Sequence, residues 1–428
     1  MKKKITITNA YTWYNKGDAG ILLATIDCLK KIYGEENVEF NILSFTPDED
    51  KKRYCKDKSI KNVYSNILNP HPYHPSKIGK LIAIFKLILK VISLNIILKF
   101  NFKKAVRKNE TLSLLNDTDI IVVCGGGFLG GKKYDSLMHV YQIYINTLFK
   151  KPIYIMGNSI EPINNKLIKY FTNKVINKVD FLFARETITY NYLKDVMSHD
   201  KFALIPDMAF MLTYEENEYE FLTNLRKDFD ILFGITVRNW NFPNVSNKEK
   251  AKENYINSIV ETVIEVIDNH HAAFIFIPQV TVHTGDDSLV AEEIRNRLPK
   301  KYKNNFIVRK DDWSPYEIKG LIKQLDYFVG TRMHSNIFAT AVRIPTVAIA
   351  YEKKTNGIME TVKLNDYIVE IDSITSKELV DKIEKMIKNK DKIKSSLNKN
   401  IPIIQNNILT VLSDNMIKES DNVKINKK

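Results

Sequence analysis

The chain has 428 residues, of which 44% are hydrophobic and 27% charged, a composition typical of a soluble globular protein. This length exceeds what one hydrophobic core usually serves, so we expect two domains. The formal net charge is +14, but the basic residues are not clustered with stacking aromatics, which excludes a recognisable nucleic-acid-binding module. The positive charge suits an anionic small substrate or an acidic membrane face.

Cysteine usage and the amino terminus bear on the compartment. The three cysteines, Cys28, Cys55 and Cys124, are widely spaced, which predicts a reducing compartment, no disulfide framework and no metal site. The first ten residues, MKKKITITNA, pass from lysines directly into a predicted strand and lack the apolar core of a signal peptide. We therefore expect a cytoplasmic protein.

The chain opens with a strand, a polar turn and a helix. A strand is predicted at Lys4–Thr8 and an amphipathic helix at Ala19–Tyr33, with Asn15, Gly17 and Asp18 between them. Gly17 would let the backbone approach a ligand closely. Asp18 is either a helix cap or a carboxylate at the carboxyl end of a strand, where ligands gather in α/β sheets.

Residues 47–75 contain four prolines and little periodicity, and we expect a loop there. The next segment, Lys77–Lys108, has an apolar face at helical spacing, interrupted by lysines before the roughly 20 apolar residues that a membrane span requires. Two interpretations stay open: an interfacial amphipathic helix, or a helix packed inside the first domain. The face consists of Ile78, Leu81, Ile82, Phe85, Ile88, Leu89, Ile92 and Ile96.

Further predicted strands end in residues suited to ligand binding. Strand Asp119–Val123 precedes a glycine cluster in which Gly126 and Gly127 would form a tight turn with exposed amides, without the spacing of a dinucleotide site. Strand Phe181–Ala184 leads to Arg185, which could simply form a helix-capping pair with its neighbour Glu186.

The pattern restarts after an acidic stretch at residues 213–230, which we interpret as a linker. A strand at Ile231–Val237 ends in Arg238. Asp286 and Asp287 open a later helix; a metal could bind there, but acids that complement the helix dipole are commoner, and we assign both as structural.

The stretch Leu325–Lys354 predicts a strand, a helix and a second strand. Its first turn carries Arg332 and His334 where helix amides begin, so the geometry favours a phosphate or a carboxylate. The alternative is a surface turn in which Arg332 and His334 only cap carbonyl groups.

These stretches resemble the polysaccharide pyruvyl transferase family. Its carboxyl-terminal signature is G-x-R-x-H followed by a helix and a Pro-led strand ending in Y-x-x-K, here Gly330, Arg332, His334, Pro345, Tyr351 and Lys354. The earlier landmarks N-x-G-D, G-G-G, R-[ED]-x-[ST], P-D-x-A-F and I-[ST]-x-R also occur in order. They include Asn15, Gly17, Asp18, Gly126, Gly127, Arg185, Asp207 and Arg238.

The alternation of strands and helices predicts parallel α/β halves, and the resemblance implies two Rossmann-like parallel-sheet domains around a cleft, as in glycosyltransferase-B enzymes. We expect an acceptor-side domain at residues 1–215, which includes segment 77–108. A donor-binding domain with terminal helices would occupy residues 216–428.

The resemblance implies transfer of the enolpyruvyl group of phosphoenolpyruvate onto a sugar of a cell-surface polysaccharide or its lipid-linked precursor, as a pyruvate ketal. Neither a metal nor another cofactor is implied. Peripheral contact with the inner membrane face would suit a lipid-linked acceptor. We assign proton transfer to His334, since its reference pKa is near neutrality, and Asp18 is a weaker candidate for the base. Substrate binding is assigned to Arg185, Arg238, Arg332, Lys354, Asn15, Gly17, Gly126 and Gly127.

Two other functions remain open. A sugar-nucleotide-dependent glycosyltransferase of the same architecture is one, because Glu352 and Glu360 have the spacing of the acidic pair in retaining glycosyltransferases. The other is a catalytically inactive, glycan-binding relative.

Overall fold

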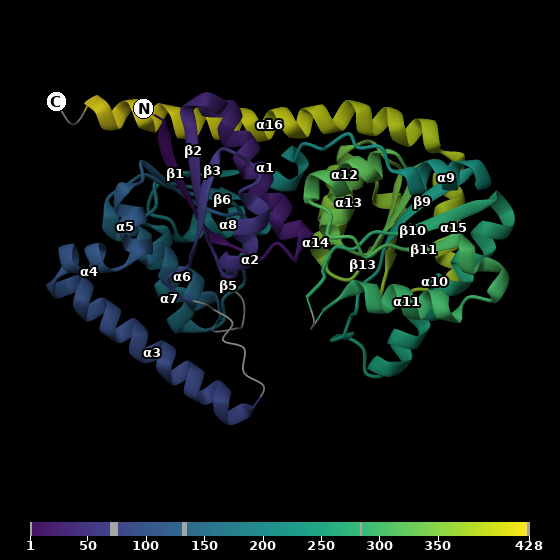
Figure 1. The fold of residues 1–428 in the computed structure, drawn as a ribbon, viewed down its shortest axis with the longest axis horizontal. Helices are drawn as coiled ribbons and strands as arrows, with labels where there is room; N and C mark the ends of the chain where they lie inside the picture. Colours follow the sequence, from purple (N-terminus) through teal and green to yellow (C-terminus); the bar gives the residue numbers. More distant parts are fainter. Residues whose placement is uncertain (1, 69–75, 131–134, 283–284, 426–428) are drawn as a thin grey trace. The chain divides into compact units, whose positions relative to one another are not determined.

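The computed structural model describes residues 2–68, 76–130, 135–282 and 285–425 (Figure 1). The chain forms two α/β units that are not continuous in sequence. The first unit comprises Met1–Trp13, Thr25–Met208 and Ile408–Lys428, and the second comprises Tyr14–Ala24 and Ala209–Asn407. The division thus differs from the two continuous halves expected from the sequence, because the start of the first helix joins the second unit.

The first unit is built on a parallel sheet of eight strands in the order β3-β2-β1-β4-β6-β7-β8, with β5 pairing with β6. Its inner strands are runs of buried β-branched and aromatic residues, as expected of strands covered on both faces. The strands are β1 (Lys3–Ala10), β2 (Val38–Ser44), β3 (Ile60–Ser65), β4 (Ile120–Val123), β5 (Gly126–Gly130), β6 (Ile153–Glu161), β7 (Phe181–Ala184) and β8 (Phe202–Leu204).

The connections of this part of the chain are mostly helical. The helices are α1 (Lys16–Tyr33), η1 (Glu35–Asn37), α2 (Pro47–Tyr54), α3 (Lys77–Phe100), α4 (Phe102–Lys108), α5 (Glu110–Asp117), α6 (Asp135–Asn146), η2 (Thr147–Phe149), α7 (Lys166–Ile176) and α8 (Thr187–Val196).

Several local expectations are wrong. The stretch predicted as a loop contains α2 and β3, and its remainder at 69–75 lies outside the described residues. Helix α1 starts at Lys16 rather than at Ala19, and the predicted glycine turn is strand β5. The expected linker contains a helix, α9 (Glu220–Asp228).

The second unit is built on a parallel sheet of six strands in the order β11-β10-β9-β12-β13-β14. From β9 the chain adds β10 and then β11 toward one edge of the sheet. It then returns to the centre with β12 and adds β13 and β14 toward the other edge, so the direction of strand addition reverses between β9 and β12. This arrangement confirms the predicted pair of Rossmann-like parallel-sheet folds. The strands are β9 (Ile231–Thr236), β10 (Ala272–Phe276), β11 (Phe306–Val308), β12 (Tyr327–Gly330), β13 (Thr346–Ala350) and β14 (Ile368–Glu370).

Helices flank this second sheet on both sides, with α12 and α13 on one side and α10 and α11 on the other (Figure 1). The last helix, α16, begins in the second unit and ends in the first. The helices are η3 (Met208–Met211), α10 (Lys248–His270), α11 (Asp287–Arg297), η4 (Lys300–Asn305), α12 (Pro315–Lys323), α13 (Met333–Ala341), α14 (Lys353–Thr361), η5 (Asn365–Tyr367), α15 (Ser376–Lys388) and α16 (Lys390–Ile425).

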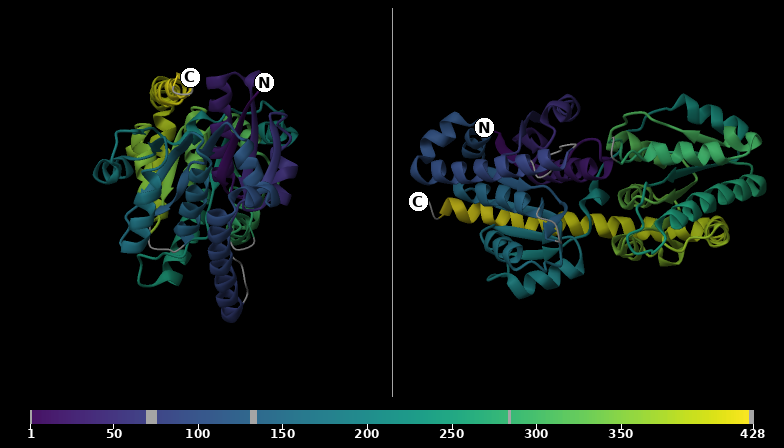
Figure 2. Two further views of the ribbon diagram at one scale, coloured as in Figure 1. Left: turned by 90° about the vertical axis from the view of Figure 1, so that its left-hand side faces the viewer. Right: turned by 90° about the horizontal axis from the view of Figure 1, so that it is seen from below.

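Helix α3 lies along the edge of the first unit (Figures 1 and 2). The apolar face predicted at Ile78–Ile96 is exposed, so the interpretation of this segment as a helix buried inside the domain is wrong. In the described part of the chain, the stretch Leu81–Phe100 is the one helical segment long and apolar enough to cross a membrane.

Candidate active site

The order reversal in the second sheet brings two arginines together. Arg238 and Arg332 each lie two residues beyond the end of a strand, β9 and β12 respectively. These strands are neighbours, with Gly330 paired to Thr236 at their carboxyl ends. Both guanidinium groups therefore start from the switch point of a doubly wound sheet, which is where ligands bind in open α/β folds.

Buried hydroxyl groups fix the backbone at this switch point. The Oγ1 of Thr236 accepts hydrogen bonds from the amides of Thr331 and Arg332 at 3.1 and 3.4 Å. The hydroxyl of Tyr255 accepts from the amide of Arg238 at 3.2 Å and lies 3.2 Å from the Oγ1 of Thr331. Burial raises the pKa of Tyr255 to about 12, so this hydroxyl stays neutral and hydrogen-bonded at physiological pH.

Only glycine fits at the first position of the G-x-R-x-H motif. A Cβ on Gly330 would lie 1.7 Å from the Oδ1 of Asn336, and the Gly330 carbonyl accepts a hydrogen bond from the Asn336 amide at 3.1 Å. This close contact sets the angle at which α13 leaves the strand.

Arg332 is held by Asp287. Its Nε and Nη2 donate to the two carboxylate oxygens at 3.0 and 2.5 Å, and the amide of Val280 donates to the same fully buried carboxylate at 3.2 Å. Burial raises the pKa of Asp287 to about 6, although Arg332 opposes the rise, so the pair is ionic at neutral pH. Asp286, assigned as structural, caps α11, since its side chain accepts from the amide of Ser288. Asp287 also lies in the first turn of this helix, and its pairing with Arg332 was not predicted.

Arg238 stacks on aromatic rings. Its guanidinium carbon lies 4.0 Å from the ring centroid of Tyr351 and 4.7 Å from that of Trp240. Burial lowers the pKa of Arg238, and the positive charge of Arg332 lowers it further. The Nε1 of Trp240 is a buried donor with no hydrogen-bond partner among the described residues. Two crowded cations beside an unused donor favour the binding of an anion.

The start of α1 belongs to this unit through backbone pairing and a buried lysine. Asn15 forms an antiparallel bridge with Val280, and the amide of Lys16 donates to the Gln279 carbonyl at 2.8 Å. The fully buried Nζ of Lys16 lies 2.6 Å from a carboxylate oxygen of Asp312. Because an unpaired buried ammonium is costly, this ion pair anchors the N-x-G-D turn.

His334 lies against this turn. A Cβ on Gly17 would be 2.2 Å from the Nδ1 of His334, so the imidazole packs directly on the glycine backbone. The side-chain amide of Asn15 donates to the Asp18 carboxylate at 2.5 Å. The structure therefore brings together three predicted residues of the amino-terminal motif and one from the carboxyl-terminal signature.

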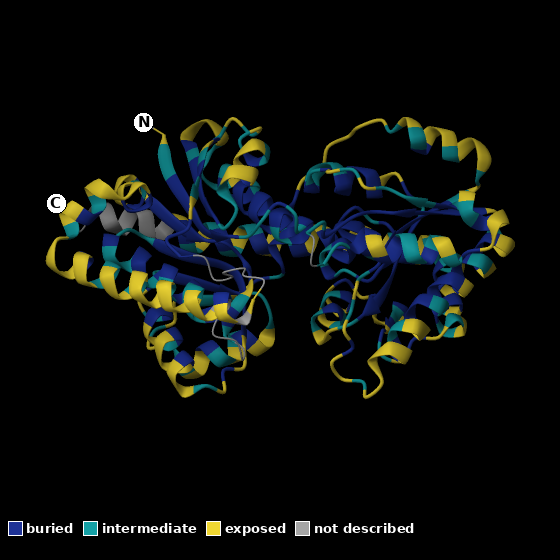
Figure 3. Ribbon diagram, turned by 60° about the horizontal axis from the view of Figure 1, so that its bottom comes forward, coloured by how far each residue is buried: buried dark blue, intermediate teal, exposed yellow. Residues whose placement is uncertain are grey.

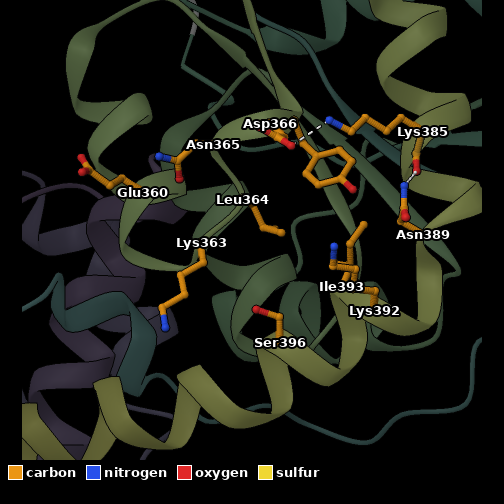
Figure 4. Close-up of a pocket in the computed structure, with 11 residues that line it drawn as sticks. Glu360, Lys363, Leu364, Asn365, Asp366, Lys385, Asn389, Lys392, Ile393 and Ser396 are labelled. Carbon is orange, nitrogen blue, oxygen red and sulfur yellow. Dashed lines mark hydrogen bonds and ion pairs between the residues drawn. The ribbon is translucent and has the colours of Figure 1, made fainter.

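Helix α14 positions Lys354 and separates Glu352 from Glu360, the acidic pair considered for a glycosyltransferase. Lys354 is half-buried in the first turn, just beyond β13 at the same edge of the sheet. Glu352 precedes α14 and Glu360 lies in its last turn, about 12 Å along the axis at 1.5 Å per residue. Glu360 instead lines a cavity of about 540 Å³ where α14 ends, together with Lys363 and Lys385 (Figure 4). Glu352 is not among the residues that line this cavity.

The first unit holds the remaining predicted residues. Nε and Nη2 of Arg185 donate to the Ser159 hydroxyl at 2.9 and 2.7 Å, and Nη1 donates to the buried Asp207 carboxylate at 3.0 Å. Gly126 and Gly127 lie in β5, where Gly126 pairs with Asn158 of β6. Arg185 is thus already bonded within its own unit.

Comparison with known proteins identifies the family. A sequence model of the polysaccharide pyruvyl transferase family matches residues 15–353, which is most of the chain. The chain belongs to this family. It is 22% identical over 419 residues to the amylovoran biosynthesis protein AmsJ of Erwinia amylovora, covering 92% of this chain and 94% of that relative.

Solved structures similar to this pyruvyl transferase family member share its fold. Glycyrrhiza uralensis UGT73P12 aligns with a TM-score of 0.60 and 10% identity, over 100% of this chain and 97% of that chain. The UDP-GlcNAc 2-epimerase of Neisseria meningitidis aligns with a TM-score of 0.55 and 12% identity, over 97% and 100%. These similarities place the protein in the glycosyltransferase-B-like architecture.

Sequence reasoning missed the partners of the predicted arginines. Asp287, Trp240 and the two partners of Arg185 (Ser159 and Asp207) were not assigned to the site. Lys16, which precedes Gly17, was not singled out either. Some signals were present: Asp207 stands in the P-D-x-A-F motif, and a second acid directly after a helix cap is redundant for capping. The pairings themselves are long-range and carry no local pattern.

The contact between Gly17 and His334 leads to a prediction for this family member. Gly17→Ala should lower turnover roughly tenfold or more, because the new methyl group displaces the imidazole. The matched control is Gly357→Ala in α14, where a Cβ meets nothing within 4 Å and stability should rise slightly. Steady-state kinetics on both folded variants check this. Equal activity of both variants would remove His334 from any position-sensitive role.

A second prediction concerns Arg185. Arg185→Met should destabilise the first unit by about 3 kcal/mol, because it leaves the buried Asp207 carboxylate without its guanidinium. Arg226→Met, which breaks a more exposed pair with Asp326, should cost no more than about 1 kcal/mol. Denaturant unfolding measures both. If Arg185→Met has the same free energy of unfolding as the unaltered protein, the guanidinium does not stabilise the fold and is instead available to bind a ligand.

Proposed function

We propose that this family member transfers the pyruvyl group of phosphoenolpyruvate to a sugar of a cell-surface polysaccharide or its lipid-linked precursor. The observation that carries the proposal is the pair of guanidinium groups, Arg238 and Arg332, at the switch point of the second sheet. Phosphoenolpyruvate is a compact anion with a phosphate and a carboxylate, each of which suits a planar guanidinium. Lys354 adds a further cation at the same edge.

Arg332 is suited to this role because Asp287 occupies only one side of its guanidinium. Nε and Nη2 are bonded to the carboxylate, which leaves the Nη1 edge to donate to a ligand. Arg238 is held in place by its aromatic neighbours and not by a described ion pair, so its charge remains available for an anion.

The proposed reaction places two demands on proton transfer. C3 of the donor takes up one proton, while C2 forms bonds to two sugar hydroxyl oxygens and loses its bond to the phosphate oxygen. The two hydroxyl protons balance the one gained by C3 and the one that leaves with phosphate. We assign donor protonation to His334, which follows Arg332 by two residues in the first turn of α13 and packs against Gly17 of the N-x-G-D turn.

Asp18 is the candidate base for a sugar hydroxyl. Its carboxylate is half-buried in the first turn of α1 and is oriented by the side chain of Asn15. Gly17 precedes Asp18 in the chain and packs against the imidazole of His334, so acid and base would act from adjacent positions.

The acceptor is proposed to bind the first unit at the switch point between β1 and β4. Aromatic rings gather there: Phe128 stacks on His139 at 4.4 Å between centroids, and Tyr11 stacks on the same imidazole at 5.8 Å. The ring of Phe45 meets His139 edge-on at 5.3 Å. Half-buried aromatic faces are suited to the apolar face of a sugar ring.

A thermal-shift comparison tests the donor. Phosphoenolpyruvate should raise the melting temperature of the protein, and UDP-GlcNAc should not, because only a ligand that binds the folded state stabilises it. Stabilisation by nucleotide sugars alone would move the assignment to a glycosyltransferase. Stabilisation by glycan alone would indicate an inactive binding protein.

A further inference from the structure

Helix α3 exposes apolar side chains over most of its length. Figure 3 shows yellow, exposed stretches along the whole helix, interrupted by teal and dark blue ones. The large exposed hydrophobic residues on it outnumber those on all the rest of the described chain together. They are Ile78, Leu81, Ile82, Ile84, Phe85, Ile88, Leu89, Ile92, Ile96, Ile97 and Phe100. An apolar surface of this extent marks an interaction site.

A narrow stripe attaches α3 to the first unit. Leu87, Val91 and Leu94 pack against the core, and Leu98 is buried in it. The side chain of Asn95 donates a hydrogen bond to the Tyr141 hydroxyl of α6 at 2.9 Å. The exposed residues are therefore not required to hold the helix in place.

Helix α7 extends the same surface. Its residues Leu167, Tyr170 and Phe171 are exposed. Phe171 also lines a cavity of about 450 Å³ whose wall includes Val91 and Asn95 of α3, so the two helices are neighbours. We call the surface formed by α3, α4 and α7 the basic apolar face.

The helices that form the basic apolar face carry positively charged side chains and no negatively charged ones. Residues 77–108 contain nine basic residues and no acidic residue, and α7 also has basic residues and no acidic one. The basic residues of the first segment are Lys77, Lys80, Lys86, Lys90, Lys99, Lys103, Lys104, Arg107 and Lys108. An apolar helix surface combined with only positive charge is complementary to an anionic lipid interface.

We propose that the basic apolar face docks onto an anionic lipid bilayer, with α3 lying in the interface. A second copy of the chain fits less well, since a two-fold contact through this face would bring like charges together. Helix α3 is long enough to span, but Lys86 and Lys90 are exposed near its middle and its other side packs against the unit. The interfacial orientation keeps both lysines at the headgroups and preserves this packing.

The proposal is independent of the donor assignment. Docking through the first unit would present the protein to an acceptor carried on a membrane lipid. Vesicle binding is measured without phosphoenolpyruvate or glycan, so its failure and the failure of the pyruvyl transfer assignment are distinguishable.

Vesicle flotation of the full-length protein tests the proposal. We expect the protein to float with vesicles of phosphatidylcholine mixed with phosphatidylglycerol, and much less with phosphatidylcholine alone. High salt should weaken the binding, because it screens the lysines. Alkaline carbonate should release the bound protein, as expected of a helix that lies on the membrane.

Matched variants separate docking from folding. The triple variant Leu81→Ser/Phe85→Ser/Ile92→Ser changes side chains that are 67, 61 and 50% exposed and should reduce vesicle binding roughly tenfold or more. The control, Ile188→Ser/Leu289→Ser/Ile403→Ser, changes side chains that are 65, 63 and 60% exposed on α8, α11 and α16, and should bind like the unaltered protein. Both should unfold at nearly the original temperature.

A charge variant tests the electrostatic part. Lys86→Glu/Lys90→Glu should lose binding to anionic vesicles, whereas Lys377→Glu/Lys388→Glu on α15 should retain it. The proposal is overturned if the unaltered protein does not float with anionic vesicles. It is also overturned if each control variant loses as much vesicle binding as the α3 variant that it is matched to. Resistance to carbonate would show a spanning helix instead. A dimer that dissociates in the serine variant of α3 would show a contact between copies.

Discussion

His334→Gln should lower turnover roughly 100-fold or more while donor affinity changes little. The glutamine side chain keeps hydrogen bonding at this position but cannot shuttle a proton, and proton transfer is the assigned role of the imidazole. Donor affinity should persist because Arg238 and Arg332 reach the switch point from β9 and β12 and do not depend on His334.

The test of His334 needs binding and rate measured separately. Isothermal titration gives the donor dissociation constant, and single-turnover kinetics give the rate of the bound complex. If the variant binds the donor poorly and turns over whatever is bound at the normal rate, His334 is only an anion ligand. Asp18, which lies in the same α1 turn as Gly17, would then be examined first as the acid.

Asp287→Asn should weaken donor affinity roughly tenfold to a hundredfold with a smaller effect on turnover of the bound donor. The substitution removes the charge that fixes the guanidinium of Arg332 through two hydrogen bonds, and a displaced guanidinium no longer meets the donor. Asp286→Asn is the matched control, because asparagine also caps a helix and the charge change is the same.

The pH dependence of donor affinity sharpens this prediction. Burial raises the pKa of Asp287 to about 6, so the carboxylate is charged above that pH and neutral below it. In the unaltered protein, donor affinity should fall as pH decreases through about 6. The phosphate group of the donor also takes up a proton near this pH, but that change affects donor binding to the unaltered protein and to Asp287→Asn equally. The ratio of the two affinities should therefore approach one at low pH.

A purely structural role for Asp287 gives a different result. The variant would then melt at a lower temperature while the Michaelis constant for the donor stayed the same at all pH values. Unchanged affinity in a folded Asp287→Asn protein would show that the Arg332–Asp287 pair serves the sheet and not the donor.

The parallel sheets were predictable because each strand signal is local. Strand β13 is a short apolar run after Pro345, and the break at Gly330 separates β12 from α13. The exposure of α3 was not predictable, since apolar residues surround the helix and periodicity cannot distinguish a buried face from an exposed one. Strand β5 was missed because glycines disfavour strands, and pairing with β6 overrides that preference.

Within the candidate site, the sequence indicated the cations but not their partners. Arg238 and Arg332 become neighbours only through the strand order, in which β12 pairs with β9 across a long stretch of chain. Asp287 reaches Arg332 from a third part of the sequence, so no spacing rule links them. Helix α2 did carry a local signal, a proline at its start followed by acids in the first turn, which we interpreted as a loop because of the nearby prolines.

Incubation of the purified protein with carbon-labelled phosphoenolpyruvate and a lipid-linked or polysaccharide acceptor is a direct test of the proposed pyruvyl transfer. We expect phosphate release in equal amount to label appearing in the glycan, and the label should be found as a pyruvate ketal by mass spectrometry. The proposed pyruvyl transfer is contradicted if the glycan gains no label while a nucleotide sugar transfers its hexose under the same conditions.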